Sequence, residues 1–223
     1  MQPYTVIVSG GRLGDPDFFR TQIEGLAGRL LVGCDGGVRH LRRAGFRPDV
    51  LLGDMDSLPA AWAAEYEQAG VKILRYPPDK DFTDTALALD YAIGQRSRRI
   101  DLWGALGGRI DHALANISLL IRGREARIFT RIVDEFAELF VADAETVIED
   151  AAGCLVSLLA LSPQAAGVTL EGFQYPLDQE ALFAAESRGI SNCITASRAV
   201  IRVAAGHLLV IRYWHRDVFP EEA

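Results

Sequence analysis

The sequence lacks the features that place a chain in a membrane or on nucleic acid. Charged residues or glycines interrupt every apolar run before it reaches membrane-spanning length. Lysine and arginine number 23 against 30 aspartate and glutamate residues, and the resulting net charge of −7 argues against a nucleic-acid partner. The acidic balance does not exclude an anionic nucleotide, because a bound cation would invert the local field. We therefore expect an ordinary globular protein with no membrane and no nucleic acid as partners.

Cysteine is also scarce. Cys34, Cys154 and Cys193 are an odd number without C-x-x-C spacing, which disfavours a disulfide framework or a zinc site. The opening MQPYTVIVSGG has no basic region and no small-residue cleavage site, so we expect a first strand there rather than a signal peptide. Together these observations predict a cytoplasmic protein.

Familiar phosphate-binding motifs are missing as well. The sequence contains no G-x-x-x-x-G-K-[ST] loop, no G-x-G-x-x-G dinucleotide fingerprint and no protein-kinase motif set. Any phosphate chemistry must therefore depend on another arrangement of side chains.

What the first half does contain is four acidic clusters: CDGG at 34–37, GDMDS at 53–57, DKDFTD at 79–84 and GGRIDH at 107–112. Each stands where a strand is expected to end or a helix to begin. Carboxylates repel one another, so a fold that gathers several of them needs a cation there at neutral pH. The clusters therefore suggest a hard divalent metal, and with it a phosphorylated ligand.

The pattern of apolar residues changes along the chain. Residues 1–127 alternate short β-rich runs, such as Tyr4–Val8 and Ile100–Trp103, with amphipathic stretches. This alternation predicts a doubly wound, mostly parallel α/β domain with its ligand crevice at the carboxyl ends of the strands. Residues 128–223 show many short strand candidates with glycine turns, residues 194–197 among them, which predicts an antiparallel β-sandwich domain.

Asp54 and Asp56 are two residues apart, so both side chains point to the same side of an extended chain. Two carboxylates placed in this way can share a metal ion and leave positions for phosphate oxygens. A solvated turn explains the same G-D-x-D-S sequence equally well. Asp35, before Gly36 and Gly37, has the same two interpretations: a ligand for a substrate polar group, or a turn after a strand.

Lys80, Asp81, Thr83 and Asp84 precede a predicted helix. Helix capping explains Thr83 and Asp84 but leaves Lys80 and Asp81 unexplained. A lysine at this position could bind phosphate as a point charge while Asp84 helps to hold a metal ion.

Two glycines and Arg109 precede Asp111 and His112 at another predicted helix start. Glycines let backbone N–H groups approach an anion, and Arg109 could clamp phosphate oxygens. A glycine turn with Asp111 as cap is the alternative, and His112 alone is typical of a packed residue rather than a catalytic base.

Taken in order, CDGGVRHL, PDVLLGDMDS, PDKDFTD and GGRIDHALANISLL resemble the thiamine pyrophosphokinase family, and the resemblance continues through GVTLEGFQYPL, RGISN and GHLLVIRY. The resemblance implies transfer of a pyrophosphoryl group from ATP to the hydroxyethyl group of thiamine, leaving AMP. It also implies a magnesium-dependent homodimer whose active sites are shared between the α/β domain of one subunit and the β domain of the other.

The resemblance further implies roles for matching residues. Asp54, Asp56 and Asp84 would hold Mg²⁺ and the polyphosphate, and Asp35 would position the thiamine hydroxyl. Lys80, Asp81, Thr83, Arg109 and Asp111 would line the nucleotide site, and Ser191 and Asn192 would face thiamine from the partner subunit. The sequence departs from animal members at Val210, where they carry a tryptophan that stacks on thiamine; Trp214 lies nearby in the sequence.

Three other functions compete with this one. A pyrophosphokinase for a pterin-type hydroxymethyl substrate would use a related α/β domain, and a catalytically silent nucleotide or thiamine-diphosphate sensor would need less carboxylate repulsion than this sequence retains. A metal-dependent glycosyltransferase with a D-x-D motif explains residues 54–56 but leaves the DKDFTD and GGRIDH clusters without a role.

Overall fold

The structure, a computed structural model, describes residues 3–214, which divide into two compact units after Glu135. The first unit has a parallel sheet in the order β6-β5-β1-β2-β3-β4. Its strands are β1 (Tyr4–Val8), β2 (Leu30–Cys34), β3 (Val50–Gly53), β4 (Lys72–Arg75), β5 (Arg99–Trp103) and β6 (Phe129–Val133). Its α-helices are α1 (Pro16–Glu24), α2 (Val38–Arg43), α3 (Ala60–Gln68), α4 (Asp84–Gly94) and α5 (Ile110–Glu125), and a 3₁₀ turn, η1 (Asp35–Gly37), precedes α2.

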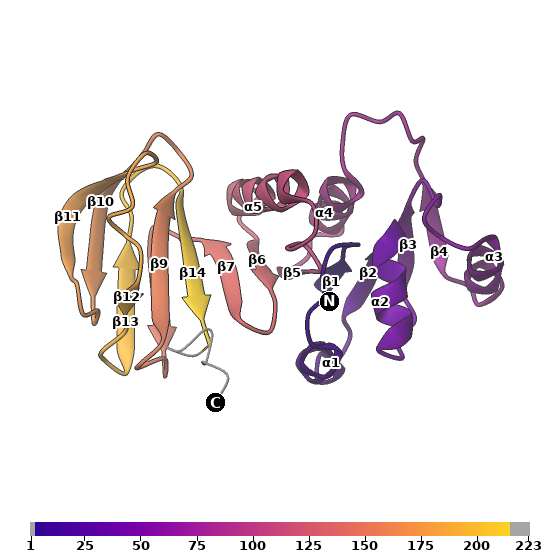
Figure 1. Cartoon of the computed structure of the whole chain (residues 1–223), viewed down its shortest axis with the longest axis horizontal. Coiled ribbons are helices and arrows are strands. Elements are labelled where there is room, and N and C mark those ends of the chain that lie inside the picture. The colour runs from indigo at the N-terminus through magenta and orange to yellow at the C-terminus, as the bar shows by residue number, and fades with distance from the viewer. Residues whose placement is uncertain (1–2, 215–223) are drawn as a thin grey trace. The chain divides into compact units, whose positions relative to one another are not determined.

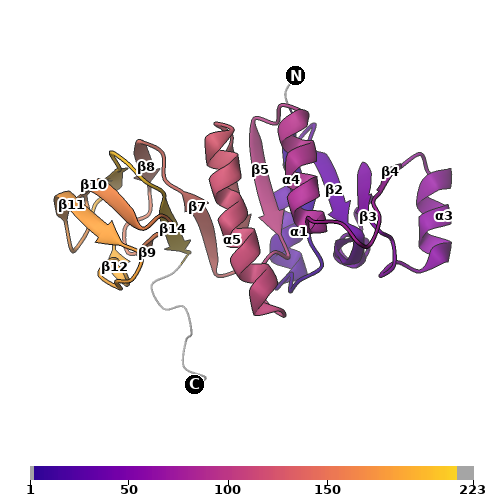
Figure 2. The same cartoon turned by 90° about the horizontal axis from the view of Figure 1, so that it is seen from above.

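The helices cover both faces of this sheet, as the alternating sequence predicts. Figures 1 and 2 show α4 and α5 side by side on one face and α1 on the opposite face. The chain leaves β1 and β5, which are neighbours, toward opposite faces, so a crevice opens between their carboxyl ends. The fold therefore places any ligand next to the segments that follow β1, β2, β3 and β5.

Local sequence explains where α1 and α4 begin. Asp15 accepts a hydrogen bond from the Asp17 backbone N–H and Pro16 occupies the first turn of α1, a combination that favours helix initiation. Thr83 caps α4 in the same way, since its hydroxyl accepts from the Ala86 N–H at 3.2 Å. The cap fixes Lys80 and Asp84 on either side of one short turn.

The second unit consists of two antiparallel sheets in the orders β12-β9-β14-β7 and β11-β10-β13-β8. Its strands are β7 (Ala137–Val141), β8 (Glu145–Glu149), β9 (Leu155–Ala160), β10 (Gln164–Glu171), β11 (Leu177–Phe183), β12 (Asn192–Cys193), β13 (Arg198–Arg202) and β14 (Leu208–Tyr213). Side chains that include Phe140, Leu158, Leu170, Ile201 and Val210 form one buried core between the sheets. The predicted sandwich is confirmed.

The structure differs from the sequence-based expectations in three places. Strand β6 pairs in parallel with β5 within the first unit, whereas the boundary predicted after residue 127 assigns it to the β domain. Strand β11 was not expected, because most of its residues are at least partly exposed and supply no apolar alternation. Residues 194–197, expected as a strand, contribute only a bridge from Ile194 to Phe173.

Within the described residues, no helix is long and apolar enough to cross a membrane.

Candidate active site

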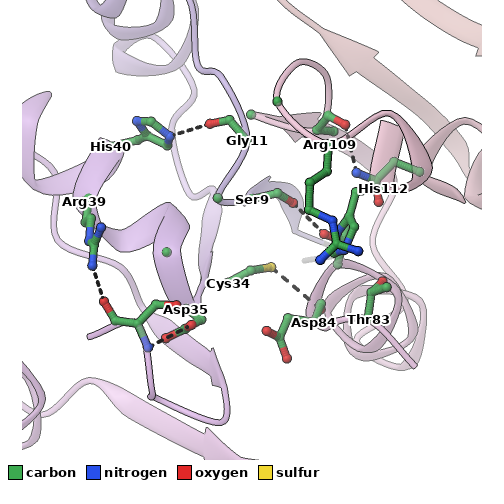
Figure 3. Close-up of a pocket in the computed structure, with 18 of the residues that line it drawn as sticks. Ser9, Gly11, Cys34, Asp35, Arg39, His40, Thr83, Asp84, Arg109 and His112 are labelled. Carbon is green, nitrogen blue, oxygen red and sulfur yellow. Dashed lines mark hydrogen bonds between the residues drawn. The ribbon is translucent and has the colours of Figure 1, made fainter. Parts of the chain in front are cut away.

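A cavity of about 950 Å³ opens in the first unit at the carboxyl ends of its strands. Its walls come from the segments after β1, β2 and β5, from α2 and from the loop before α4. Figure 3 shows Asp35 and Arg39 on one side of the cavity and Thr83, Asp84 and His112 on the other. The volume is sufficient for a nucleotide-sized ligand.

Glycines allow the loops after β1 and β5 to approach one another at the base of the cavity. Ser9 N donates to Trp103 O at 2.8 Å, and Gly11 N donates to Gly104 O at 2.9 Å. Gly104 has a φ of +60°, and a Cβ there would lie 2.5 Å from the Ser9 carbonyl oxygen. A side chain at this position would therefore push the two loops apart.

Three carboxylates gather beside the cavity. One oxygen each from Asp35, Asp54 and Asp56 lies within 4.8 Å of the other two. Asp35 Oδ1 is buried and has no hydrogen-bond partner among the described residues, while Oδ2 accepts from the Ser57 N–H at 3.3 Å. An unpartnered buried carboxylate oxygen is costly unless a cation or a donor binds it, so these residues fit a hard divalent metal such as Mg²⁺.

Lys80 joins the remaining carboxylate to this group. Its Nζ lies 3.3 Å from Asp54 Oδ2 and 3.1 Å from Asp84 Oδ1. Burial lowers the pKa of Lys80, but hydrogen bonds and charge from Asp84 and Asp54 outweigh it and raise the pKa overall. The ammonium therefore stays charged between two carboxylates, as a phosphate-binding lysine must.

The acids of the site titrate differently. Burial raises the pKa of Asp35, and the neighbouring charges of Asp54 and Asp56 raise it further. Burial also raises the pKa of Asp84, with Lys80 acting in the opposite direction. Asp54 is the exception: the backbone N–H of Asp56 leads the interactions that lower its pKa, and Lys80 adds to them. Perturbed carboxylates of both kinds in one cleft are typical of functional sites.

The backbone at the acidic residues is strained. Asp35 has a φ of +22° and Met55, between Asp54 and Asp56, has a φ of +68°. Residues other than glycine enter this region rarely, and such positions concentrate at ligand sites. The surrounding fold holds Asp35 in place through Gly37, where a Cβ would lie 2.0 Å from the Val8 carbonyl oxygen.

Three of the residues predicted to bind the nucleotide lie along the opposite wall. Asp81, Thr83 and Arg109 line the cavity. Arg109 donates to Asp111 Oδ2 at 2.5 Å, and this hydrogen bond lowers the pKa of Asp111 to about 2. Asp111 is exposed and does not line the cavity, so it orients Arg109 rather than forming the wall itself.

Several residues around the cavity were not predicted from the sequence. Arg39 and Arg43 of α2 add positive charge to the wall, and His40 of the same helix also lines it. His40 Nε2 lies 2.7 Å from the Gly11 carbonyl oxygen and holds the loop after β1. The i, i+4 spacing of Arg39 and Arg43, one helical turn after the CDGG segment, was a signal that could have identified both.

Hydroxyl groups form part of the cavity base. The Ser9 and Thr85 hydroxyls are buried and lie 2.8 Å apart. Asn116 is also buried and donates to the Ala105 carbonyl at 2.8 Å. Asn116 therefore supports the loop after β5.

Comparisons with known proteins agree with this geometry. Residues 27–130 match the thiamin pyrophosphokinase catalytic domain, and residues 145–208 match the thiamin pyrophosphokinase vitamin B1 binding domain. Thiamine pyrophosphokinase from Bacillus subtilis is 33% identical over 185 residues, which cover 82% of this chain and 86% of that protein. The chain belongs to the thiamin pyrophosphokinase family.

Solved structures of the thiamin pyrophosphokinase family share the whole architecture. The Bacillus subtilis enzyme superposes with a TM-score of 0.83 at 30% identity, covering 94% of this chain and 98% of that one. The Geobacillus thermodenitrificans protein gives a TM-score of 0.78 at 35% identity, with 94% and 97% covered. The yeast protein, at 16% identity and a TM-score of 0.77, shows the same fold.

The residues predicted to contact thiamine lie in the second unit, within the part that matches the family's vitamin B1 binding domain. Ser191 is exposed, with a φ of +59°. Asn192 is buried: its Oδ1 accepts from the Tyr175 N–H at 3.0 Å and its Nδ2 donates to the Tyr175 carbonyl at 2.8 Å. The Asn192 amide thus fixes the turn at Tyr175, whose own side chain is 60% exposed.

Val210 points into the core of the sandwich and is fully buried. The position at which the sequence departs from animal members of the family therefore has a packing role in this chain. The Arg212 guanidinium lies 5.1 Å from the centre of the Trp214 ring, so that tryptophan already stacks on an arginine.

Proposed function

We propose that this chain transfers a pyrophosphoryl group from ATP to thiamine, giving thiamine diphosphate and AMP. The observation that supports the proposal most directly is the acidic group of Asp35, Asp54 and Asp56 beside a nucleotide-sized cavity, in a chain of this family. ATP is the co-substrate and thiamine the acceptor. The pterin and sensor alternatives receive no support from the comparisons, since both matched domains are those of thiamin pyrophosphokinase.

Mg²⁺ is the metal that we assign to the site. Asp54 and Asp56 belong both to the set predicted from the sequence and to the group brought together in the structure, and we propose them as its ligands. Asp35 and Asp84 complete the acidic wall on either side. When bound, the ion would offset the negative charge of the phosphate oxygens.

The protein's own groups would position the reactants. Lys80, which carries its charge between Asp54 and Asp84, is placed to bind a phosphate oxygen. Arg109 would contact the nucleotide from the opposite wall. In the reaction the thiamine hydroxyl oxygen bonds to the β-phosphorus while the bond between that phosphorus and the α-phosphate oxygen breaks, so AMP leaves with that oxygen.

Asp35 is the group that we assign to the thiamine hydroxyl. Its Oδ1 has no hydrogen-bond partner among the residues described, so it can accept a hydrogen bond from the incoming hydroxyl. Its raised pKa makes it a better proton acceptor than an ordinary surface aspartate. The strained backbone at Asp35 fixes the direction of this acceptor before substrate binds.

The activity is tested by incubating the protein with ATP, Mg²⁺ and either thiamine or a hydroxymethyl pterin, with mass analysis of the products. We expect thiamine diphosphate and AMP in equal amounts. ADP as the nucleotide product, or conversion of the pterin alone, would contradict the proposal.

We further propose a cytoplasmic homodimer whose active sites are shared between subunits. The three cysteines are free thiols, as expected in a reducing compartment. The acidic group and the segment containing Ser191 and Asn192 belong to separate compact units, which is compatible with a site built from two subunits. Sequence resemblance to the family favours this arrangement.

Complementation tests the shared site. An Asp54→Asn subunit is mixed with a subunit carrying Ser191→Ala and Asn192→Ala, after each has been shown to be folded and inactive. Random exchange should restore about a quarter of the normal sites, since half of the dimers are mixed and each has one intact site. Absence of recovery after confirmed exchange would show that each chain builds its own site.

A further inference from the structure

Phe82 is an aromatic residue that is not packed into the hydrophobic core. It lies in the loop between β4 and α4, lines the cavity, and is 55% exposed. Exposing a large apolar ring to water is unfavourable, and a ligand that covered the ring would remove that cost. It stands between Lys80 and Asp84, two residues of the charged group, so what covers it must lie next to the polyphosphate position.

Within this loop, Phe82 and Lys80 point in different directions, and only Lys80 points toward the acidic group of Asp35, Asp54 and Asp56. Lys80 turns toward β3, where its Nζ meets Asp54. Phe82 turns toward α5, where the Arg122 guanidinium lies over its ring at 6.0 Å from the centre. Arg122 is itself held by an ion pair with Asp90 of α4, the helix beside α5 in Figures 1 and 2.

We propose that Phe82 is the stacking platform for the adenine ring of ATP and contributes to the choice of nucleotide. This inference rests on the proposed function, which puts the triphosphate at Lys80. The base then extends away from the carboxylates, toward α5, where Phe82 supplies an aromatic surface. Aromatic side chains bind bases through their faces without hydrogen bonds.

The charges of the two substrate rings indicate which of them stacks on Phe82. The thiazolium ring of thiamine is a cation, whereas adenine is neutral. Arg122 already places one cation over the Phe82 ring, which makes a second cation on that ring unfavourable and leaves a neutral base as the suitable occupant. The thiamine hydroxyl must also reach the β-phosphorus, which keeps the thiazolium ring on the carboxylate side.

Equilibrium binding tests the proposal without requiring turnover. AMP and inorganic tripolyphosphate are titrated into the wild-type protein and into Phe82→Ala and Phe82→Tyr variants. We expect Phe82→Ala to weaken AMP binding about tenfold, the scale of one base–aromatic stack, and Phe82→Tyr to retain it. Tripolyphosphate, which has no base, should bind all three proteins alike.

Phe129 supplies a matched control. It is 38% exposed, has the Arg99 guanidinium 5.1 Å from its ring centre, and does not line the cavity. Phe129→Ala should leave AMP binding unchanged. Equal weakening by Phe82→Ala and Phe129→Ala, or equal weakening of AMP and tripolyphosphate by Phe82→Ala, would overturn the proposal.

Steady-state kinetics separates this inference from the proposed function. If Phe82→Ala raises KM for ATP and leaves KM for thiamine unchanged, both stand. If it raises KM for thiamine alone, Phe82 serves the other substrate and the inference fails while the function stands. If the wild-type protein shows no transfer to thiamine but AMP binding still depends on Phe82, the function fails and the stacking role stands.

Discussion

Acidic residues in the candidate site of the first unit are arranged differently from those on the sheets of the second unit. In the second unit, Arg202 pairs with Glu145 and Glu171 across the sheet, and Arg188 pairs with Glu180. In the first unit, Asp35 keeps an unpartnered buried oxygen among the described residues and lies within a few ångströms of two further carboxylates. Charge that the fold leaves unneutralised marks where a ligand is needed.

The same contrast holds for buried amides and acids. Asn192 of the sandwich satisfies its carboxamide on the Tyr175 backbone, and burial there stabilises a turn. Burial of Asp35 and Asp84 instead raises their pKa values, because it disfavours the charged carboxylates. The candidate site therefore keeps buried acids at a cost in stability, whereas Asn192 stabilises the structure of the sandwich.

The largest effect that would sharpen this contrast is on catalysis. Asp54→Asn should lower turnover by about 10²–10³-fold, because it removes the charge of a proposed Mg²⁺ ligand. The fold should persist, since Lys80 still pairs with Asp84. Activity and melting temperature are measured together.

Asp178→Asn is the control for this prediction. Asp178 is an exposed aspartate of β11 in the second unit, so the substitution should leave both quantities unchanged. An Asp54→Asn protein with near-normal turnover would remove Asp54 from the metal site.

A smaller effect should appear in the stability of the second unit. Asn192→Ala leaves the Tyr175 N–H and carbonyl without their partners and should reduce the free energy of unfolding by about 1–3 kcal/mol. Ser191→Ala, at the exposed neighbouring position, should change it little. Chemical denaturation measures both, and equal stabilities for the two variants would contradict the structural role of Asn192.

The smallest effect should be a gain in stability. Asp35→Asn removes a buried charge, and asparagine tolerates the positive φ at this position, so without Mg²⁺ we expect about 1 kcal/mol of added stability at neutral pH. Turnover should nevertheless be lost.

The pH dependence of this gain follows from the raised pKa of Asp35. The folded state holds its proton more tightly than the unfolded state, so wild-type stability falls as pH rises from the ordinary value of 3.8 through the folded-state pKa. The advantage of Asp35→Asn should therefore shrink as pH is lowered toward 3.8 and vanish below it. Denaturation at several pH values checks the trend, and a constant difference would show that Asp35 is not the cause.

Much of the fold followed from local sequence. The alternation of apolar runs and amphipathic stretches predicted β1 and β5 nearly to the residue, and a threonine before an acidic residue marked the start of α4. Strand β11 could not be predicted, because its polar, partly exposed residues become a strand only when they pair with β10.

Parts of the site were predictable for the same local reason. Asp54 and Asp56 lie close together in the sequence, but the chain between them is a turn, with a φ of +68° at Met55, and not the extended segment that was expected. Lys80 and Asp84 flank one helix cap, as the sequence indicates. The approach of Asp35 to Asp54 depends on the parallel pairing of β2 with β3, which no local pattern specifies. The position of the Arg122 guanidinium over the Phe82 ring likewise depends on how α5 packs beside α4.

The sequence by itself determined which residues carry charge at the ends of the strands, the α/β-then-β order and the resemblance to the thiamin pyrophosphokinase family. Only the tertiary structure decided that Asp35 lies beside Asp54 and Asp56, that Asn192 holds a turn and that Val210 is core. The physical reason is that periodicity and capping act over one or two turns of chain. Burial and the pairing of charges depend instead on which segments meet in space. Those contacts set the pKa values of the carboxyl groups and leave polar atoms such as Asp35 Oδ1 without a hydrogen-bond partner among the described residues, and the site is inferred from both.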